Sequence, residues 1–371
     1  MSDNDLDPAR EPAADTVTLL RRRPVQAAGI AVVLAGVAGA FLYVGGYLTP
    51  GRLGSDRILN AMEANAGGAH AGYRRAHAKG ICIAGSFTGD PAGAALSRAA
   101  VFGGGAIPVT GRLAEGTPDP YAKDADNGVR SMALSLQPPG GAEWRMAIND
   151  TPGLHVSTPE DFYANIVASK PDPATGKPDP ARMAAFLATH PEAAAFKARM
   201  QAKPLASGFA NDSYNSINGF LFVAPDGTRR LVRWSMQAED SFATLAPEVR
   251  KARSANYLFD DLLVRVRQGP IRWRLIATVA APGDPNRAAV LWPADRRQVA
   301  MGVLTIDRVE SEATGNCRDI NYDPLILPPG IAPSDDPIPF ARSAVYATSF
   351  RRRSGEQTPP PAVAGQSAEA K

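Results

Sequence analysis

Two residues near the end of the chain, Arg342 and Tyr346, have types and spacing that suit iron chemistry. Residues four apart share one face of a helix, so the arginine would lie over the tyrosine side chain. A tyrosine ligates haem iron only as a phenolate, and a neighbouring cation favours that charged form. Arg351 and Arg353 follow at positions that could pair with carboxylates. Taken alone, an arginine and a tyrosine four apart are more typical of an ordinary helix contact. Other segments of the chain must therefore show whether the pair is an iron site.

The second chemical segment is Arg74-Arg-Ala-His77-Ala-Lys-Gly80, which runs into the apolar stretch 81–87. A neutral imidazole accepts and returns a proton near neutral pH, which cleavage of a peroxide O–O bond requires. Farther along, Asn149 in the segment 148–152 offers an amide donor that would stabilise charge developing on an oxygen. An isolated histidine among apolar residues is more often part of the core, and an isolated asparagine is often a turn residue.

The order and spacing of these segments resemble the haem catalases. The histidine before Ala-Lys-Gly resembles the distal signature of that family, and the segment of Asn149 resembles its distal asparagine region. Further segments agree in order: Gly283–Pro285, Leu291–Arg296, Gly302–Ile306, Tyr322–Pro324 and Leu327–Ile331. The resemblance spans about residues 57–353 and is to the short branch of the family, the catalase-related haem peroxidases. It implies one haem b per chain.

The resemblance also implies a role for each matching residue. His77 and Asn149 would be catalytic, and Tyr346 would be the axial ligand of the haem iron. The residues implied in holding the cofactor are Arg74, Arg112, Phe162, Arg342 and Arg353. Among these, the arginines at 74, 112 and 353 would pair with the haem propionates, and Phe162 would stack on the porphyrin. Arg342 would keep the tyrosine ligand ionised.

One departure from the family pattern affects the histidine. Large catalases have Phe-Ser after the arginine that corresponds to Arg112, whereas this chain has Leu113-Ala114. The change removes a hydroxyl expected to support His77, so we expect less exact proton handling. The chain also ends soon after the proximal helix, and we expect a more open haem edge.

These features predict a peroxidase that reduces organic hydroperoxides, and hydrogen peroxide more slowly, with a small reducing co-substrate. The alternatives are a short true catalase, a lipid-hydroperoxide isomerase and a non-enzymatic haem-binding module, because fold alone does not fix function. We expect a monomer or a small homo-oligomer. A net charge of +3 over 371 residues argues against a nucleic-acid partner.

The hydrophobic pattern predicts an α+β fold with an antiparallel barrel of about eight strands, surrounding helices and one N-terminal transmembrane helix. The predicted strands are 80–87, 106–113, 129–137, 143–149, 217–223, 229–236, 272–280 and 302–309. A helical insert divides them, with Asp179-Pro180 and His190-Pro191 as helix starts. Ser55-Asp56 should begin another helix, which Gly67-Gly68 would end.

The domain prediction follows from composition. Residues 1–24 are expected to be a disordered cytoplasmic segment, and 25–48 form an uncharged run of 24 residues, long enough to cross a bilayer. Arg21–Arg23 before this run favour a single-pass inner-membrane protein whose catalytic domain faces the periplasm. A cleaved signal peptide is the alternative. The catalytic domain is predicted at 55–354 and a disordered tail at 355–371.

The chain has two cysteines, Cys82 and Cys317. An even count permits one disulfide in an oxidising compartment, but sequence alone does not show that the two residues meet. We expect two buried thiols, with one disulfide as the alternative.

Overall fold

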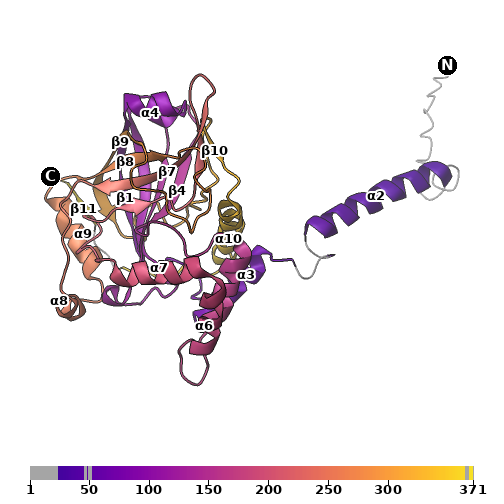
Figure 1. The fold of residues 1–371 in the computed structure, drawn as a ribbon, viewed down its shortest axis with the longest axis horizontal. Coiled ribbons are helices and arrows are strands. Elements are labelled where there is room, and N and C mark those ends of the chain that lie inside the picture. The colour runs from indigo at the N-terminus through magenta and orange to yellow at the C-terminus, as the bar shows by residue number, and fades with distance from the viewer. Residues whose placement is uncertain (1–23, 46–47, 49–51, 364–366, 371) are drawn as a thin grey trace, which may run out of the picture. The chain divides into compact units, whose positions relative to one another are not determined.

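The structure is a computed structural model that describes residues 24–45, 48, 52–363 and 367–370. It divides into a short N-terminal unit, residues 1–54, and a large unit, residues 55–371. The N-terminal unit contains helix α2, Pro24–Val44 (Figure 1). This helix has a mean hydropathy of 2.2 and is long and apolar enough to cross a membrane, a property that signal sequences share. Apart from Pro24, the stretch expected to be disordered at 1–24 lies outside the described residues.

The large unit is built on a closed antiparallel barrel, as the pattern predicted. Its strands pair in a ring whose members are β1 (Gly80–Gly89), β2 (Ala106–Glu115), β3 (Arg130–Leu136), β4 (Trp144–Asn149), β5 (Tyr214–Asn215), β7 (Arg229–Ala238), β8 (Ile271–Val279) and β9 (Gln298–Glu310). The ring closes because β9 pairs with both β8 and β1. Closure leaves each of these strands with a neighbour on both sides and so removes exposed sheet edges.

One predicted strand differs from the structure. The segment 217–223 appears as β6, Phe220–Val223, which pairs with the first half of β7. The two-residue strand β5 pairs with the second half of the same edge and makes the contact to β4. Between them Ile217 has a φ of 56°, which interrupts the strand. A two-residue strand has no readable periodicity, so sequence could not place β5.

The barrel interior is a core of large apolar side chains. Trp144 on β4 and Trp234 on β7 lie edge to face with ring centroids 5.2 Å apart. Phe102 and Phe222 also pack against Trp144, with ring centroids 5.8 and 6.3 Å from its own. Aromatic pairs in this geometry contribute about 0.5–1.5 kcal/mol beyond the area that they bury. These aromatic residues are part of the main hydrophobic core of the large unit.

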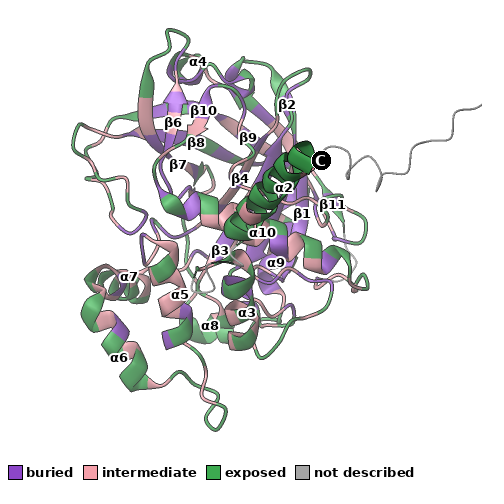
Figure 2. Ribbon diagram, turned by 90° about the vertical axis from the view of Figure 1, so that its right-hand side faces the viewer, coloured by how far each residue is buried: buried purple, intermediate pink, exposed green. Residues whose placement is uncertain are grey.

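Helices surround the barrel (Figure 1). They are α3 (Ser55–Asn65), α4 (Pro91–Leu96), α5 (Pro159–Ala168), α6 (Pro180–Thr189), α7 (Pro191–Ala202), α8 (Pro247–Ala252), α9 (Tyr257–Arg267) and α10 (Pro337–Ser354). The predicted starts of α3, α6 and α7 are confirmed, and the Asp179 side chain caps α6 by accepting from the Ala181 amide. Helices α5, α6 and α7 share a small cluster of their own, and much of the surface of α6 and α7 is exposed (Figure 2).

The segment after α10 is not a free tail over its described residues, contrary to our expectation. The Glu356 carboxylate pairs with the guanidinium of Arg75, and the Tyr73 hydroxyl donates to the Pro360 carbonyl at 2.7 Å. Strand β11, Ala368–Glu369, lies in this segment and pairs with β9. Strand β10, Ile331–Pro333, comes before α10 and pairs with β6. The partners of Glu356 and Pro360 lie 281 and 287 residues earlier in the chain, so the low-complexity composition of the tail concealed them.

Candidate active site

The candidate site begins as one face of four neighbouring strands. Strand register places Cys82, Arg112, Ala133 and Ala147 in one row across β1 to β4. A second row, two residues further along, contains Ala114, Ser131 and Asn149. Alternate residues of a strand point to the same face, so both rows look away from the barrel core. The alanine side chains on this face are small and leave space for a cavity next to the sheet.

Helices α3 and α10 form the opposite wall of a cavity. Leu59 and Met62 of α3, and Val345, Tyr346 and Arg353 of α10, line it together with the two strand rows. The two helices are held together by Arg352, which reaches Glu63 at 3.0 Å and Asp56 at 2.7 Å. The cavity therefore brings residues from both ends of the large unit to one place.

His77 lies at the strand side of the cavity, in the loop before β1. Its backbone has a φ of 55°, a region that a non-glycine residue adopts only when its surroundings enforce it. Arg112 supplies that enforcement, because its guanidinium donates to the carbonyls of His77 at 2.7 Å and Ala78 at 3.0 Å. Burial, and then the charges of Arg112 and Arg342, lower the pKa of His77 to about 4. At neutral pH the imidazole is therefore uncharged and able to accept a proton.

The hydroxyl that we expected to be missing at His77 is present, but it comes from another strand. The Ser131 Oγ lies 2.8 Å from Nδ1 of His77 and 3.3 Å from the Ala114 carbonyl. A serine hydroxyl that donates to this carbonyl accepts from the imidazole, which puts the proton on Nδ1 and leaves Nε2 free as a base. The expectation of weaker support for His77 is wrong, because Ser131 is the cross-strand partner of Ala114.

On the helix side, the predicted pair on α10 meets. The Nη2 of Arg342 donates to the Tyr346 hydroxyl at 3.2 Å, and its guanidinium carbon lies 5.6 Å from the tyrosine ring centroid. The same guanidinium donates to the Asn218 side chain at 2.9 Å and to the Ala147 carbonyl at 2.7 Å. These bonds fix the cation beside the phenol. Tyr346 and His77 thus line the same cavity from opposite walls.

Three arginines gather where β1, β2 and α10 come together. Arg74, Arg112 and Arg353 all line the cavity. Burial, followed by the charges of Arg112 and Arg353, lowers the pKa of Arg74 to about 9. Arg351 and Arg353 differ in exposure. The Arg351 side chain is 72% exposed and lies 4.0 Å from Asp56, whereas the Arg353 side chain is 4% exposed. The residue at 353, rather than 351, is therefore the candidate partner for a carboxylate.

Two predicted site residues remain to be placed. Asn149, at the end of β4, lines the cavity beside Ser131. Phe162 is not among the lining residues; its ring lies 5.6 Å from that of His155 and packs in the cluster of α5, α6 and α7. Sequence reasoning missed Ser131 and Glu312. The hairpin register of β2 and β3 would have revealed the serine, whereas Glu312 reaches Arg112 from 200 residues away.

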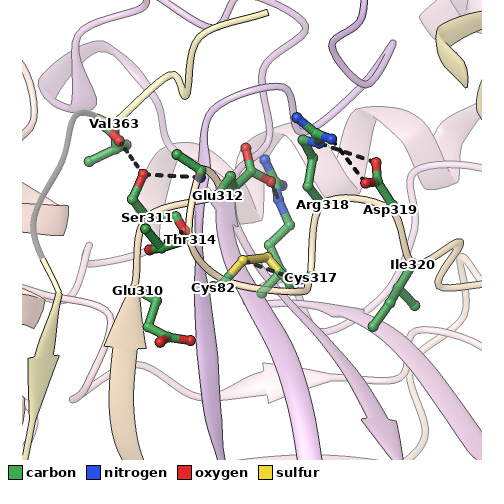
Figure 3. Close-up of a disulfide and its surroundings, with 12 residues drawn as sticks. Cys82, Glu310, Ser311, Glu312, Thr314, Cys317, Arg318, Asp319, Ile320 and Val363 are labelled. Atoms are coloured by element: carbon green, nitrogen blue, oxygen red, sulfur yellow. Dashed lines mark hydrogen bonds and ion pairs between the residues drawn. A yellow bond between two sulfur atoms is a disulfide. The ribbon is translucent and has the colours of Figure 1, made fainter. Parts of the chain in front are cut away.

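The two cysteines are joined as a disulfide, so the expectation of two thiols is wrong (Figure 3). Cys82 points out of the barrel from β1 and meets Cys317 in the loop after β9. Their separation of 235 residues explains why neither local pattern nor spacing showed the pairing.

The barrel, the face of small residues and the tyrosine helix define a catalase-type architecture, and comparisons with known proteins agree. The catalase family model matches residues 69–359. A fungal catalase structure superimposes with a TM-score of 0.67 at 18% identity, over 77% of this chain and 60% of that one. Catalase A from Saccharomyces cerevisiae gives 0.64 at 17% identity, over 76% of this chain and 62% of its own. The chain thus spans about three fifths of these solved catalases.

Relatives of similar length narrow the class. A catalase-related peroxidase of Synechococcus elongatus is 37% identical over 80% of this chain and 88% of its own length. A catalase-related peroxidase of Mycolicibacterium paratuberculosis is 30% identical over 84% of this chain and 99% of its own. The chain belongs to the catalase family. Within it the chain groups with the catalase-related peroxidases, and it is an oxidoreductase of the peroxidase type.

Proposed function

We propose that the chain binds one haem b in the cavity between the strand face and α10, and reduces organic hydroperoxides at the expense of a small reducing co-substrate. Hydrogen peroxide would be a slower substrate. The observation that carries the proposal is the opposition, across one cavity, of His77 with Asn149 on one wall and Tyr346 with Arg342 on the other.

The charge of the cavity supports a cofactor with two carboxylates. Among the described residues, one buried carboxylate faces Arg74, Arg112 and Arg353, that of Glu312, which accepts from Arg112 at 2.6 Å. The carboxylate of Asp319, which is 70% exposed, lies 3.7 Å from Arg353. The Nε of Arg74 and the Nη2 of Arg353 are buried without a hydrogen-bond partner among the described residues. A buried guanidinium nitrogen without a partner is costly, so these two atoms favour binding of an anionic group. Two propionates would supply the missing charge and the missing acceptors.

The protein residues have separate tasks in this proposal. Bound haem would supply the iron centre at which peroxide is reduced. Nε2 of His77 accepts the proton of the inner peroxide oxygen and returns it to the outer oxygen, which leaves as an alcohol or water. Ser131 holds the required tautomer, and the Asn149 amide donates to the peroxide. The Arg342 cation keeps the Tyr346 oxygen available as a ligand. Overall, one hydroperoxide, two electrons from the co-substrate and two protons give one alcohol and one water, and hydrogen peroxide would give two waters.

The cavity also has apolar walls, which include Leu59, Met62, Met132, Val345 and Phe350. These side chains would pack against the porphyrin ring, and about 25 cal/mol is gained for each Å² of apolar surface that they remove from water. The preference for organic hydroperoxides over hydrogen peroxide is part of the proposal and is tested by comparing the two substrates.

We also propose that α2 is an uncleaved anchor and that the large unit faces the periplasm. The disulfide supports an oxidising compartment, since cytosolic reductants keep most thiols reduced. Alkaline phosphatase fused after residue 371 should be active in cells, and externally added protease should degrade the large unit in spheroplasts while the anchor stays with the membrane. A protected large unit would contradict this orientation.

The proposed activity is tested on the purified full chain in detergent. The visible spectrum should show high-spin ferric haem at about one haem per chain, and cumene hydroperoxide should drive oxidation of a dye donor. A preparation that takes up no haem during reconstitution would contradict the proposal.

A further inference from the structure

One loop contacts all three arginines proposed to bind the haem propionates. This arginine-binding loop, residues 311–320, follows the end of β9 and carries Cys317 of the disulfide (Figure 3). The Arg74 Nη2 donates to three of its backbone carbonyls, those of Cys317, Arg318 and Ile320, at 3.3, 3.0 and 2.8 Å. Those bonds fix the guanidinium of Arg74 while its Nε stays unpartnered.

The same loop reaches the other two arginines through carboxylates. Glu312 accepts from the Nε of Arg112 at 2.6 Å, and Asp319 lies 3.7 Å from Nη1 of Arg353. The two carboxylates differ in exposure: the Glu312 side chain is 6% exposed and that of Asp319 is 70% exposed. The loop therefore contacts all three guanidinium groups, and Arg112 is held in addition by the carbonyls of His77 and Ala78.

The loop is tied to the barrel at one covalent point. Cys317 is bonded to Cys82, which is the direct cross-strand partner of Arg112 on β1 and β2. The Cys317 amide also donates to the Cys82 sulfur at 3.3 Å. A side chain at Gly315 would come within 2.6 Å of the Cys82 Cβ, so the loop packs directly on the disulfide. The disulfide thus joins β1, the strand next to that of Arg112, to the loop that holds Arg74.

We propose that the Cys82–Cys317 disulfide is a positioning element for the cofactor: it locks the arginine-binding loop so that Arg74, Arg112 and Arg353 are preorganised for the propionates of the haem. This inference rests on the haem proposal above. In its absence the loop would be free to move, and binding would have to restrain it again before the three charges converge. The chain would then retain haem fully only after the disulfide has formed.

The test measures haem release from the detergent-solubilised full chain to excess apomyoglobin. Cys82→Ala/Cys317→Ala should release haem about 10-fold faster than the wild type, the scale typical of lost outer-shell partners. The matched control is Ile83→Val, on the same strand but facing the barrel core. It lowers stability without touching the loop and should leave the release rate unchanged.

Coupling separates a positioning role from general destabilisation. Arg74→Gln should accelerate release in the wild type but much less in the cysteine-free variant, because the arginine is already unpositioned there. If the cysteine-free variant does not fold, haem release is measured on the wild type and on Arg74→Gln after both are reduced with dithiothreitol. The reduction converts the protein disulfide to two thiols and dithiothreitol to its cyclic disulfide. Thiol titration follows the reduction.

Three outcomes would overturn the inference: two titratable thiols in the wild type, equal haem release with and without the disulfide, or fully multiplicative effects of the arginine and cysteine changes. Each is distinguishable from failure of the haem proposal itself, in which the wild type would hold no haem at the start.

Discussion

The Ser131 hydroxyl lies 2.8 Å from the Nδ1 of His77, directly across the strand pair from Ala114. A hydroxyl that the family pattern puts on β2 is thus supplied by β3. Cross-strand partners stand only about 5 Å apart, so either position can reach the same imidazole nitrogen. A hydroxyl oxygen can therefore reach Nδ1 of His77 from position 131, as here, or from position 114.

The first prediction concerns this relocated hydroxyl. Ser131→Ala should lower the peroxidase kcat/KM about 10-fold, because the free nitrogen of His77 is no longer fixed, a magnitude typical for lost orienting partners. Haem content should not change. Adding Ala114→Ser to that variant should restore most of the rate. A double variant no faster than Ser131→Ala would show that the serine acts in another way.

Removal of the proposed base should separate binding from catalysis. His77→Ala should retain haem but lose about 100- to 10,000-fold of the peroxidase rate, the usual contribution of a general acid–base group. Stopped-flow mixing with cumene hydroperoxide measures the step directly. Full activity in this variant would move the base to another residue.

The pKa of His77 predicts the acid limb of the rate profile. Burial lowers this pKa to about 4, so the neutral base is present above pH 4 and is lost as the pH falls through that value. The kcat/KM for a hydroperoxide should therefore stay level from about pH 7 down to pH 5 and decline near pH 4. An exposed histidine would instead give a limb near pH 6.5. A limb at that higher value in the wild type would contradict the assignment.

The tyrosine assignment has a matched control within the same cavity. Tyr346→Phe should weaken haem binding and shift the visible spectrum, because the proposed iron ligand is lost. Tyr322 also lines the cavity, and its hydroxyl is buried without a partner among the described residues. Tyr322→Phe should therefore keep the wild-type spectrum. Unchanged spectra in both variants would reject the ligand assignment, and a shift in Tyr322→Phe alone would transfer it.

Much of the fold was readable from the sequence because the strands are short apolar or alternating segments bounded by turn residues. Strand β4, for example, alternates buried and half-buried residues along its whole length. The start of α6 was readable because a capping aspartate followed by proline is a local signal. The Arg342–Tyr346 contact was predictable because it depends only on helical spacing.

The missed features all depend on contacts between distant segments. Ser131 meets His77 because two strands are in register, the disulfide joins residues 235 apart, and the tail pairs with Arg75 from the far end of the chain. Phe162 packs against the small cluster of α5, α6 and α7, although α5 also contacts α3 and α10. Its stacking on the porphyrin stays a prediction. Side-chain type alone does not contain this information.

The most direct test of the central claim compares two reactions of the haem-loaded full chain. We predict a higher kcat/KM for cumene hydroperoxide, measured by oxidation of a dye donor, than for hydrogen peroxide, with slow evolution of oxygen from hydrogen peroxide. Oxygen evolution near the diffusional limit of about 10⁸ M⁻¹s⁻¹, together with no turnover of cumene hydroperoxide, would instead show that the protein is a true catalase.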